Sequence, residues 1–250
     1  MVGGGGSRKR RPAAGAKAAA SARSASAARR SGAGSPKSAT KRAQKPEPQP
    51  APLTGTFVLG VVPGATPGKW IDAWQQRHPE APLELRPFSV ADQLAQLRSG
   101  EIDAAIVRLP LDREGLHVIP LYDEVPVAVV SVDSHLTAAD ELTLDDLAGE
   151  IVIVPRDDVL AAVIPGAVAP AFTPPVDTAE AIATVAAGVG VIVVPMSLAR
   201  LHRRKDVDYR PLRGAPTSRV ALAWPAEATT PAVEAFVGIV RGRTANSSRS

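Results

Sequence analysis

The loop of residues 63–69 carries glycine and lysine in an order that could bind a phosphate group. Its sequence, PGATPGK, follows a run of apolar residues. A phosphate-binding P-loop has the pattern GxxxxGK[ST], in which backbone N–H groups surround the phosphates and a hydroxyl group helps to hold magnesium. Here Gly64 and Gly68 are one residue closer together than the pattern requires, and Trp70 replaces the hydroxyl residue. Since Pro67 also lacks a backbone N–H, we expect no nucleotide site here.

Three hydroxyl side chains stand where a strand is expected to end and a helix to begin: Thr66, Ser89 and Thr178. The first turn of a helix has backbone N–H groups without partners and the positive end of the helix dipole. Several such helix starts around one cavity would bind a small anion, typically a carboxylate. Each hydroxyl can also simply cap its own helix, and Asp92 follows Ser89 at capping-box spacing. Both interpretations stay open.

No other pattern indicates catalysis or a metal site. The chain has no cysteine, and its four histidines lack the spacing of metal ligands. The motifs GxSxG, HExxH and GxGxxG do not occur. The acidic pairs at 123–124, 145–146 and 157–158 stand at the ends of expected elements, where solvated caps are usual. We therefore predict a protein that is not an enzyme and has no cofactor or metal.

The hydrophobic pattern predicts an α/β chain from residue 55 onward. Strands are predicted at 57–62, 83–88, 103–107, 126–132, 151–154, 191–194, 207–212 and 219–224. Helices are predicted at 69–78, 90–99, 143–147, 159–164, 179–187, near 197–201, and after the cap Thr230. The first three strands alternate with helices, which indicates a parallel sheet covered on both faces. Junctions near 123–126 and 213–217 are expected to cross between two lobes.

Residues 181–199 carry no charge and are nearly long enough to span a bilayer. Gly188, Gly190 and Pro195 divide this stretch into a helix, a turn and a β-branched run. We therefore predict a buried helix and strand here, and no membrane contact.

Residues 1–50 differ sharply in charge from the rest of the chain. They contain twelve Lys and Arg against the single acid Glu47, whereas residues 51–250 contain seventeen against twenty-four acids. Because they have almost no large apolar residues, we predict that residues 1–54 form a disordered basic tail, and that residues 244–250 are disordered too. Their charges interrupt any apolar stretch of a secretory signal. With the absence of cysteine, this predicts a cytoplasmic protein.

The tail could bind DNA without reading its sequence, by releasing counterions from the phosphates. In composition it resembles the Ala/Lys/Pro tails of bacterial nucleoid proteins and linker histones. The candidate DNA contacts are Arg8, Lys9, Arg10, Arg11, Lys17, Arg23, Arg29, Arg30, Lys37, Lys41, Arg42 and Lys45. A solvated tail without a partner is the alternative.

Several stretches between residues 55 and 242 resemble one known family in a single collinear order. The most specific, residues 90–110, is VADQLAQLRSGEIDAAIVRLP; others are FVLGVVPGA, LTLDDLAGEIVIVP and TAEAIATVAAGVGVIVVPMSLA. Together they resemble the effector-binding (substrate-binding) domain of LysR-type transcriptional regulators. The resemblance implies a two-lobed fold like that of type 2 periplasmic binding proteins. Such a fold has parallel-rich sheets flanked by helices, two hinge strands, and a small effector in the cleft.

The resemblance also implies the lobes and the pocket. Lobe I would comprise residues 55–124 and 214–243, and lobe II residues 125–213. The implied pocket residues are Pro63, Gly64, Ala65, Thr66, Ser89, Arg108, Leu109, Pro155, Asp157 and Thr178. Arg108 is the preferred partner of an effector carboxylate, because a guanidinium group pairs with it bidentately. A surface ion pair of Arg108 with Asp112 or Glu114 is the alternative.

Two features depart from the family pattern. Nothing in residues 1–54 resembles the winged helix-turn-helix and linker helix with which such regulators begin. In addition, Pro165 and Pro170 interrupt a stretch where the family carries a longer helix.

We predict a LysR-like protein without its own helix-turn-helix that closes its lobes on a small, anionic metabolite. Its tail would contact DNA nonspecifically, and the resemblance allows for a homodimer. The alternatives are a nucleoid-associated or interaction protein with a vestigial cleft, and an enzyme on the same fold.

Overall fold

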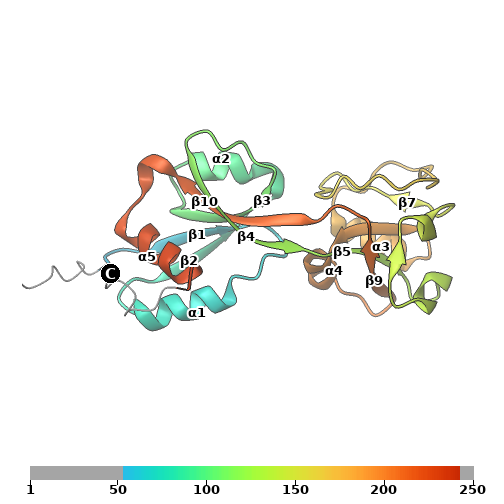
Figure 1. Ribbon diagram of the computed structural model, residues 1–250, viewed down its shortest axis with the longest axis horizontal. Coiled ribbons are helices and arrows are strands. Elements are labelled where there is room, and N and C mark those ends of the chain that lie inside the picture. The colour runs from blue at the N-terminus through green and yellow to red at the C-terminus, as the bar shows by residue number, and fades with distance from the viewer. Residues whose placement is uncertain (1–52, 243–250) are drawn as a thin grey trace, which may run out of the picture. The chain divides into compact units, whose positions relative to one another are not determined.

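The structure, a computed structural model, describes residues 53–242, which contain two five-stranded sheets (Figure 1). The first sheet and its helices are formed by segments of the predicted lobe I, and the second by segments of the predicted lobe II, so these names are kept. The predictions for the basic tail and the last seven residues fall almost entirely outside the described range.

Lobe I contains a mixed sheet in the order β2-β1-β3-β10-β4. Its strands are β1 (Phe57–Val61), β2 (Leu83–Pro87), β3 (Ala104–Leu109), β4 (Leu116–Glu124) and β10 (Ser218–Pro225). The strand β1 pairs in parallel with β2 and β3, as the alternating pattern predicted. By contrast, β10 is antiparallel to both β3 and β4.

Helices cover both faces of this sheet. They are α1 (Gly68–Arg77), α2 (Gln93–Arg98) and α5 (Pro231–Val240), with the short 3₁₀ helices η1 (Val90–Asp92) and η4 (Ala226–Ala228). The side chains of α1 and α5 pack on one face of the sheet, and Leu97 of α2 packs on the other. The strands β1, β3 and β10 therefore have apolar partners on both faces, which explains the continuous apolar runs in the sequence.

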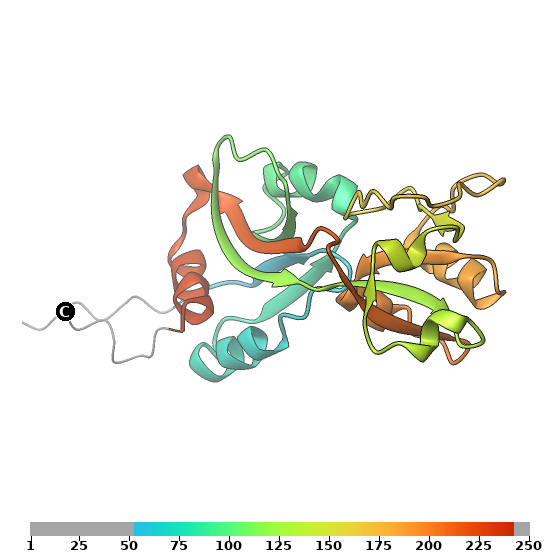
Figure 2. The same ribbon diagram turned by 45° about the vertical axis from the view of Figure 1, so that its right-hand side comes forward.

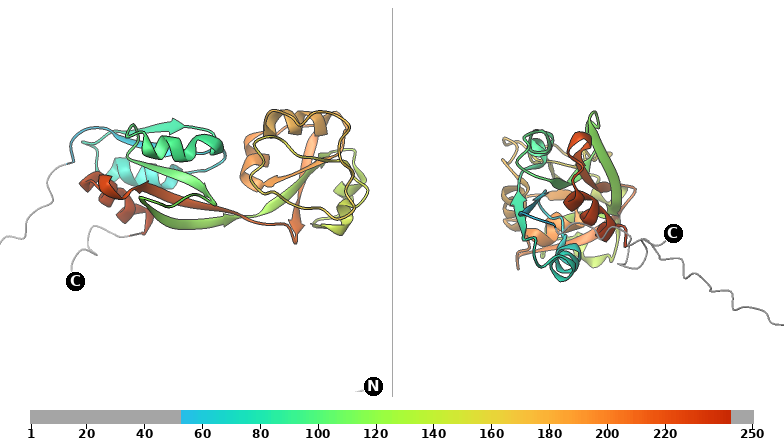
Figure 3. Two further views of the ribbon diagram at one scale, coloured as in Figure 1. Left: turned by 90° about the horizontal axis from the view of Figure 1, so that it is seen from above. Right: turned by 90° about the vertical axis from the view of Figure 1, so that its left-hand side faces the viewer.

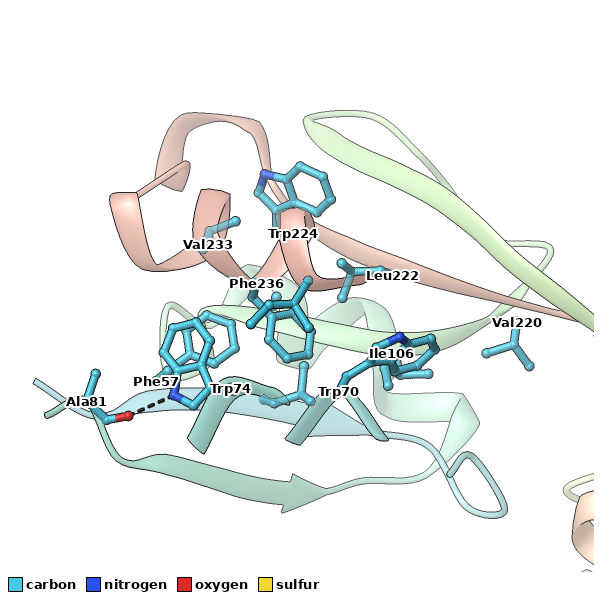
Figure 4. Packing of buried hydrophobic residues seen from close by; sticks show 13 residues of the cluster. Phe57, Trp70, Trp74, Ala81, Ile106, Val220, Leu222, Trp224, Val233 and Phe236 are labelled. Atoms are coloured by element: carbon cyan, nitrogen blue, oxygen red, sulfur yellow. Dashed lines mark hydrogen bonds between the residues drawn. The ribbon is translucent and has the colours of Figure 1, made fainter. Parts of the chain in front are cut away.

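An aromatic cluster forms the centre of the α1–α5 face (Figure 4). Trp74 is fully buried, and its ring centroid lies 4.8 Å from that of Phe57 and 6.0 Å from that of Phe236. Its indole Nε1–H donates to the carbonyl oxygen of Ala81 at 2.7 Å. The helix α1 ends at Arg77 with His78 as its C-cap, next to Pro79 as expected.

Lobe II contains a second sheet in the order β6-β9-β5-β8-β7. Its strands are β5 (Pro126–Ser131), β6 (Leu142–Thr143), β7 (Val152–Ile153), β8 (Val191–Pro195) and β9 (Val207–Arg213). Its helices are α3 (Thr178–Ala186), α4 (Met196–Leu201), and the 3₁₀ helices η2 (His135–Ala138) and η3 (Asp145–Leu147). The uncharged stretch 181–199 thus spans α3, a turn, β8 and the start of α4. No helix in residues 53–242 is long and apolar enough to cross a membrane.

The chain passes between the two sheets twice. It enters the second sheet from β4 to β5 and returns from β9 to β10 (Figures 1 and 2). The ends of these connections are adjacent, because Glu124 of β4 pairs with Ser218 of β10. Figure 3 shows the two connecting segments side by side.

Three local predictions are corrected by the structure, and the strand β4 was missed. Residues 159–164 form no helix: the Asp158 carboxylate accepts the N–H groups of Leu160 and Ala161, and Ala161 has a φ of 47°. Residues 143–147 contain the end of β6 and a single 3₁₀ turn. The predicted helix 90–99 begins as the separate 3₁₀ turn η1. The strand β4 was not predicted, because His117, Pro120 and Asp123 interrupt its apolar pattern.

Candidate functional site

A cavity of about 530 Å³ is lined by residues of both lobes, and we call it the interlobe pocket. Lobe I contributes the loop after β1, the turn after β2, and β3. Lobe II contributes the segment after β7, the start of α3, and α4. The lining residues are Pro63, Ser89, Val90, Ala91, Arg108, Arg156, Asp157, Asp158, Val159, Val176, Asp177, Leu198 and His202.

Arg108 lies at the end of β3 with its side chain only 2% exposed, so the alternative of a surface ion pair with Asp112 or Glu114 is wrong. Its Nη2 lies 2.8 Å and its Nε 3.1 Å from Oε2 of Glu124, whose side chain is 5% exposed. Asp112 instead pairs with Arg98 on the surface, at 3.0 Å. Arg108 is therefore half of a buried ion pair.

The remaining N–H groups of Arg108 also have partners inside the protein. Nη1 donates to the carbonyl oxygen of Pro63 at 2.6 Å, and Nη2 donates to the hydroxyl of Ser197 at 3.1 Å. Nε also lies 3.1 Å from the hydroxyl of Ser218. Of the five N–H groups of the guanidinium, one on Nη1 is left. An effector carboxylate could therefore not pair bidentately with Arg108 unless these bonds first broke.

The Arg108–Glu124 pair lies between the interlobe pocket and a second cavity of about 470 Å³, which we call the hinge pocket. Arg108 lines the first cavity, and both Glu124 and Ser197 line the second. Gly64 lies in close contact with Ser197 at this boundary. Its φ is +80°, and a Cβ on this residue would lie 2.8 Å from the Ser197 hydroxyl. A glycine is required at this close approach.

The three predicted hydroxyl residues do not line one cavity. Thr66 lines the hinge pocket, and the cap of α1 is Pro67, so Thr66 caps no helix. Ser89 lines the interlobe pocket and does act as a cap, accepting the N–H of Asp92. Thr178 is buried and reaches neither cavity; it donates its hydroxyl to Asp157 at 2.9 Å. The structure therefore does not bring these three hydroxyls around one anion site, and the capping interpretation holds for Ser89.

The other residues implied by the resemblance are also divided between cavities and core. Gly64 and Ala65 line the hinge pocket, Asp157 lines the interlobe pocket, Leu109 packs on the lobe I core, and Pro155 is buried. Arg156, which lies between the implied residues Pro155 and Asp157, also lines the interlobe pocket, as do Asp158, Asp177 and His202, which were not among the implied pocket residues. Asp158 and Asp177 are sequence neighbours of Asp157 and Thr178, so their position could have been predicted. No sequence pattern predicted that His202 lines the pocket, because its position depends on how α4 packs.

The charged groups facing the interlobe pocket are mostly acidic. Asp177 caps α3 by accepting the N–H of Glu180 at 2.8 Å, and Asp157 and Asp158 lie in the segment after β7. The Asp177 carboxylate thus already occupies the N-terminal end of α3, which was one of the candidate anion-binding helix starts. Arg156 is exposed, and its side chain has no partner within residues 53–242. The charged side chains of the interlobe pocket without an ion-pair partner are therefore the carboxylates of Asp157, Asp158 and Asp177 and the guanidinium of Arg156. No group of residues suited to bind a metal ion occurs in the described part of the chain.

Tyr122 faces the hinge pocket and is electrostatically coupled to the same ion pair. Burial and the nearby Glu124 carboxylate raise the pKa of the Tyr122 phenol, while Arg108 and hydrogen bonds from Thr66 oppose this rise. The phenol therefore stays protonated and uncharged at neutral pH.

Residues 50–245 match the family model described as the LysR substrate binding domain. The chain belongs to this family. It is 28% identical over 221 residues to the Hca operon transcriptional activator HcaR of Escherichia coli, covering 84% of this chain and 74% of HcaR. It is 35% identical over 139 residues to the HTH-type transcriptional regulator CatR of Pseudomonas putida, covering 52% of this chain and 47% of CatR.

Solved structures of LysR-family domains confirm the predicted fold. The oxidized form of OxyR aligns with a TM-score of 0.62 at 23% identity, over 78% of this chain and 98% of that structure. The BenM effector binding domain with its effector benzoate aligns with a TM-score of 0.61 at 19% identity, over 78% of this chain and 95% of that structure. The two-lobed periplasmic-binding-protein-like architecture is therefore that of a LysR effector-binding domain.

Proposed function

We propose that this domain is a metabolite sensor in transcriptional control. The interlobe pocket carries the proposal, because it is lined from both lobes in a chain of the LysR substrate binding domain family. A ligand that contacts both walls would favour the closed arrangement of the lobes over the open one. HcaR and CatR are named as transcriptional regulators, which supports a regulatory, non-enzymatic role.

The free charges of the pocket support a zwitterionic effector, such as an amino acid, in place of a simple anion. Arg156 is the lining cation with free N–H groups, and a guanidinium pairs well with a carboxylate. Asp157 and Asp177 are acceptors for an ammonium group on the same wall. A purely anionic effector would meet three carboxylates against the single guanidinium of Arg156.

The test compares amino acids with their matched 2-keto acids in a thermal-shift screen of the full chain. An amino acid that binds should raise the melting temperature saturably, by an amount equivalent to about 2.7 kcal/mol when present at 100 times its Kd. The keto acid, which lacks the ammonium group, should stabilise the protein much less. Asp177→Asn should remove the difference while keeping the helix cap, because Asn caps as well as Asp.

Arg156→Ala should weaken binding of the hit roughly tenfold or more, and Arg241→Ala, outside the pocket, should have no effect. Stronger stabilisation by keto acids than by amino acids would show that the effector is anionic after all. If a stabilising compound were turned over, the protein would be an enzyme. If no compound in the screen stabilised the folded chain, the sensor proposal would be rejected.

A second proposed function is nonspecific DNA contact by residues 1–50, which lie outside the described range. The twelve cations against one acid support it. DNA retention by the full chain should fall steeply with salt, with a log–log slope of about −0.9 for each phosphate neutralised. A variant with all twelve cations changed to glutamine keeps the tail length and should lose retention. Unchanged retention in that variant would refute the proposal.

We also propose that the protein is cytoplasmic, forms a homodimer and associates with the nucleoid. The lack of cysteine and the regulatory names of the relatives support the first. A chain that retained DNA but responded to no metabolite would favour the nucleoid-associated alternative with a vestigial cleft.

A further inference from the structure

The hinge pocket is formed by three segments that are distant in sequence. They are the loop after β1 (Gly64–Thr66), the end of β4 with the first connection to lobe II, and the helix α4. Its volume of about 470 Å³ lies in the range of small-molecule sites, roughly 300–1,000 Å³. The Arg108–Glu124 pair and Ser197 separate it from the interlobe pocket.

Exposed apolar side chains converge on this cavity. Tyr122, Val125 and Leu201 line it and are 37%, 49% and 53% exposed, which makes them three of the ten exposed large hydrophobic residues within residues 53–242. Met196 lies beside them. Scattered apolar residues on a surface are ordinary, but a group gathered around a cavity indicates a surface that something covers.

The free charge at this cavity is positive. Arg200 of α4 is exposed, and its one contact in the described part of the chain is a long bond of 3.4 Å from Nε to the hydroxyl of Tyr209. Its two terminal nitrogens are therefore available. Glu124 also lines the cavity, but its charge is compensated by Arg108. A carboxylate is the group that complements such a guanidinium.

We propose that the hinge pocket is a second ligand site, for a small carboxylic acid with an aliphatic or aromatic body. The hydrocarbon body would cover Tyr122, Val125 and Leu201, and the carboxylate would pair with Arg200. This site differs in charge and lining from the interlobe pocket, so it stands or falls independently of the proposed sensor function.

The proposal is tested by calorimetric titration of the full chain with hexanoate and phenylacetate, each compared with its uncharged amide. Both acids should bind saturably with one site per chain, and the amides should bind roughly tenfold or more weakly, because the charged hydrogen bonds are lost. Arg200→Ala should weaken the acids to the level of the amides, and Arg200→Lys should restore part of the affinity. Leu201→Ser should weaken both the acids and the amides.

Two control variants locate the binding. Arg203→Ala removes a nearby exposed cation that does not line the hinge pocket, and Asp177→Asn alters only the interlobe pocket; neither should change the titration. The proposal is overturned if millimolar acid gives no binding, or if Arg200→Ala leaves binding unchanged. It is also overturned if sedimentation shows that the apolar group is covered by a second copy of the chain, with Leu201→Ser abolishing the dimer.

Discussion

Replacing Arg108 with leucine should lower the free energy of unfolding by about 3–5 kcal/mol. The substitution removes the cation from a pair whose side chains are 2% and 5% exposed, and so leaves the Glu124 carboxylate buried without compensation. It also leaves the carbonyl oxygen of Pro63 without its donor. The loss is measured by urea unfolding followed by circular dichroism.

The matched control is the surface pair of Arg98 and Asp112, whose side chains are 49% and 55% exposed. Arg98→Leu should cost about 0–1 kcal/mol, because exposed pairs contribute little. Combining Arg108→Met with Glu124→Leu removes both buried charges and should recover a large part of the loss. Equal costs for Arg108→Leu and Arg98→Leu would contradict the assignment of Arg108 as a structural residue.

The case of Arg108 shows how far sequence could define the site. The family resemblance pointed to this residue and to the strand that carries it, because both are encoded in one continuous segment. Its role depends on partners that lie 16, 89 and 110 positions further along the chain: Glu124, Ser197 and Ser218. No local pattern identifies such partners, so the guanidinium was taken to be free for an effector when it is already paired.

Helix starts show the same division between local and tertiary information. The cap at Ser89 was predictable, because the cap and the N–H that it accepts are three residues apart. At α3 the pattern placed the helix start correctly, but Asp177 is the cap and Thr178 turns inward to Asp157. Which of two adjacent polar residues caps a helix depends on what packs against it.

The strand β4 could not be predicted from its pattern, because His117, Pro120 and Asp123 interrupt its apolar residues. Buried and exposed residues do not alternate regularly along β4. A register shift also interrupts its pairing with β10 between Val220 and Ala221. By contrast, the continuous apolar runs of β1, β3, β5 and β8 are buried on both faces, and these strands were found.

The second large effect concerns the aromatic cluster of lobe I, and its test is Trp74→Ala. We expect a loss of about 3–5 kcal/mol, because the indole is fully buried and its removal leaves a cavity beside the rings of Phe57 and Phe236. Trp74→Phe keeps an aromatic ring but leaves the carbonyl oxygen of Ala81 unpaired, and should cost about 1–3 kcal/mol.

The three tryptophans of the chain allow this loss to be assigned to one lobe. Trp70, Trp74 and Trp224 all belong to the lobe I cluster, so the two that remain in Trp74→Ala report lobe I alone, whereas circular dichroism reports both lobes. We expect the fluorescence midpoint in urea to fall further than the midpoint of the dichroism signal. Val163→Ala, at a residue of lobe II that is 83% exposed, should change stability by less than about 0.5 kcal/mol. A cost for Trp74→Ala no larger than that of Trp74→Phe would mean that the hydrogen bond to Ala81, and not the packing of the ring, stabilises this face of the sheet.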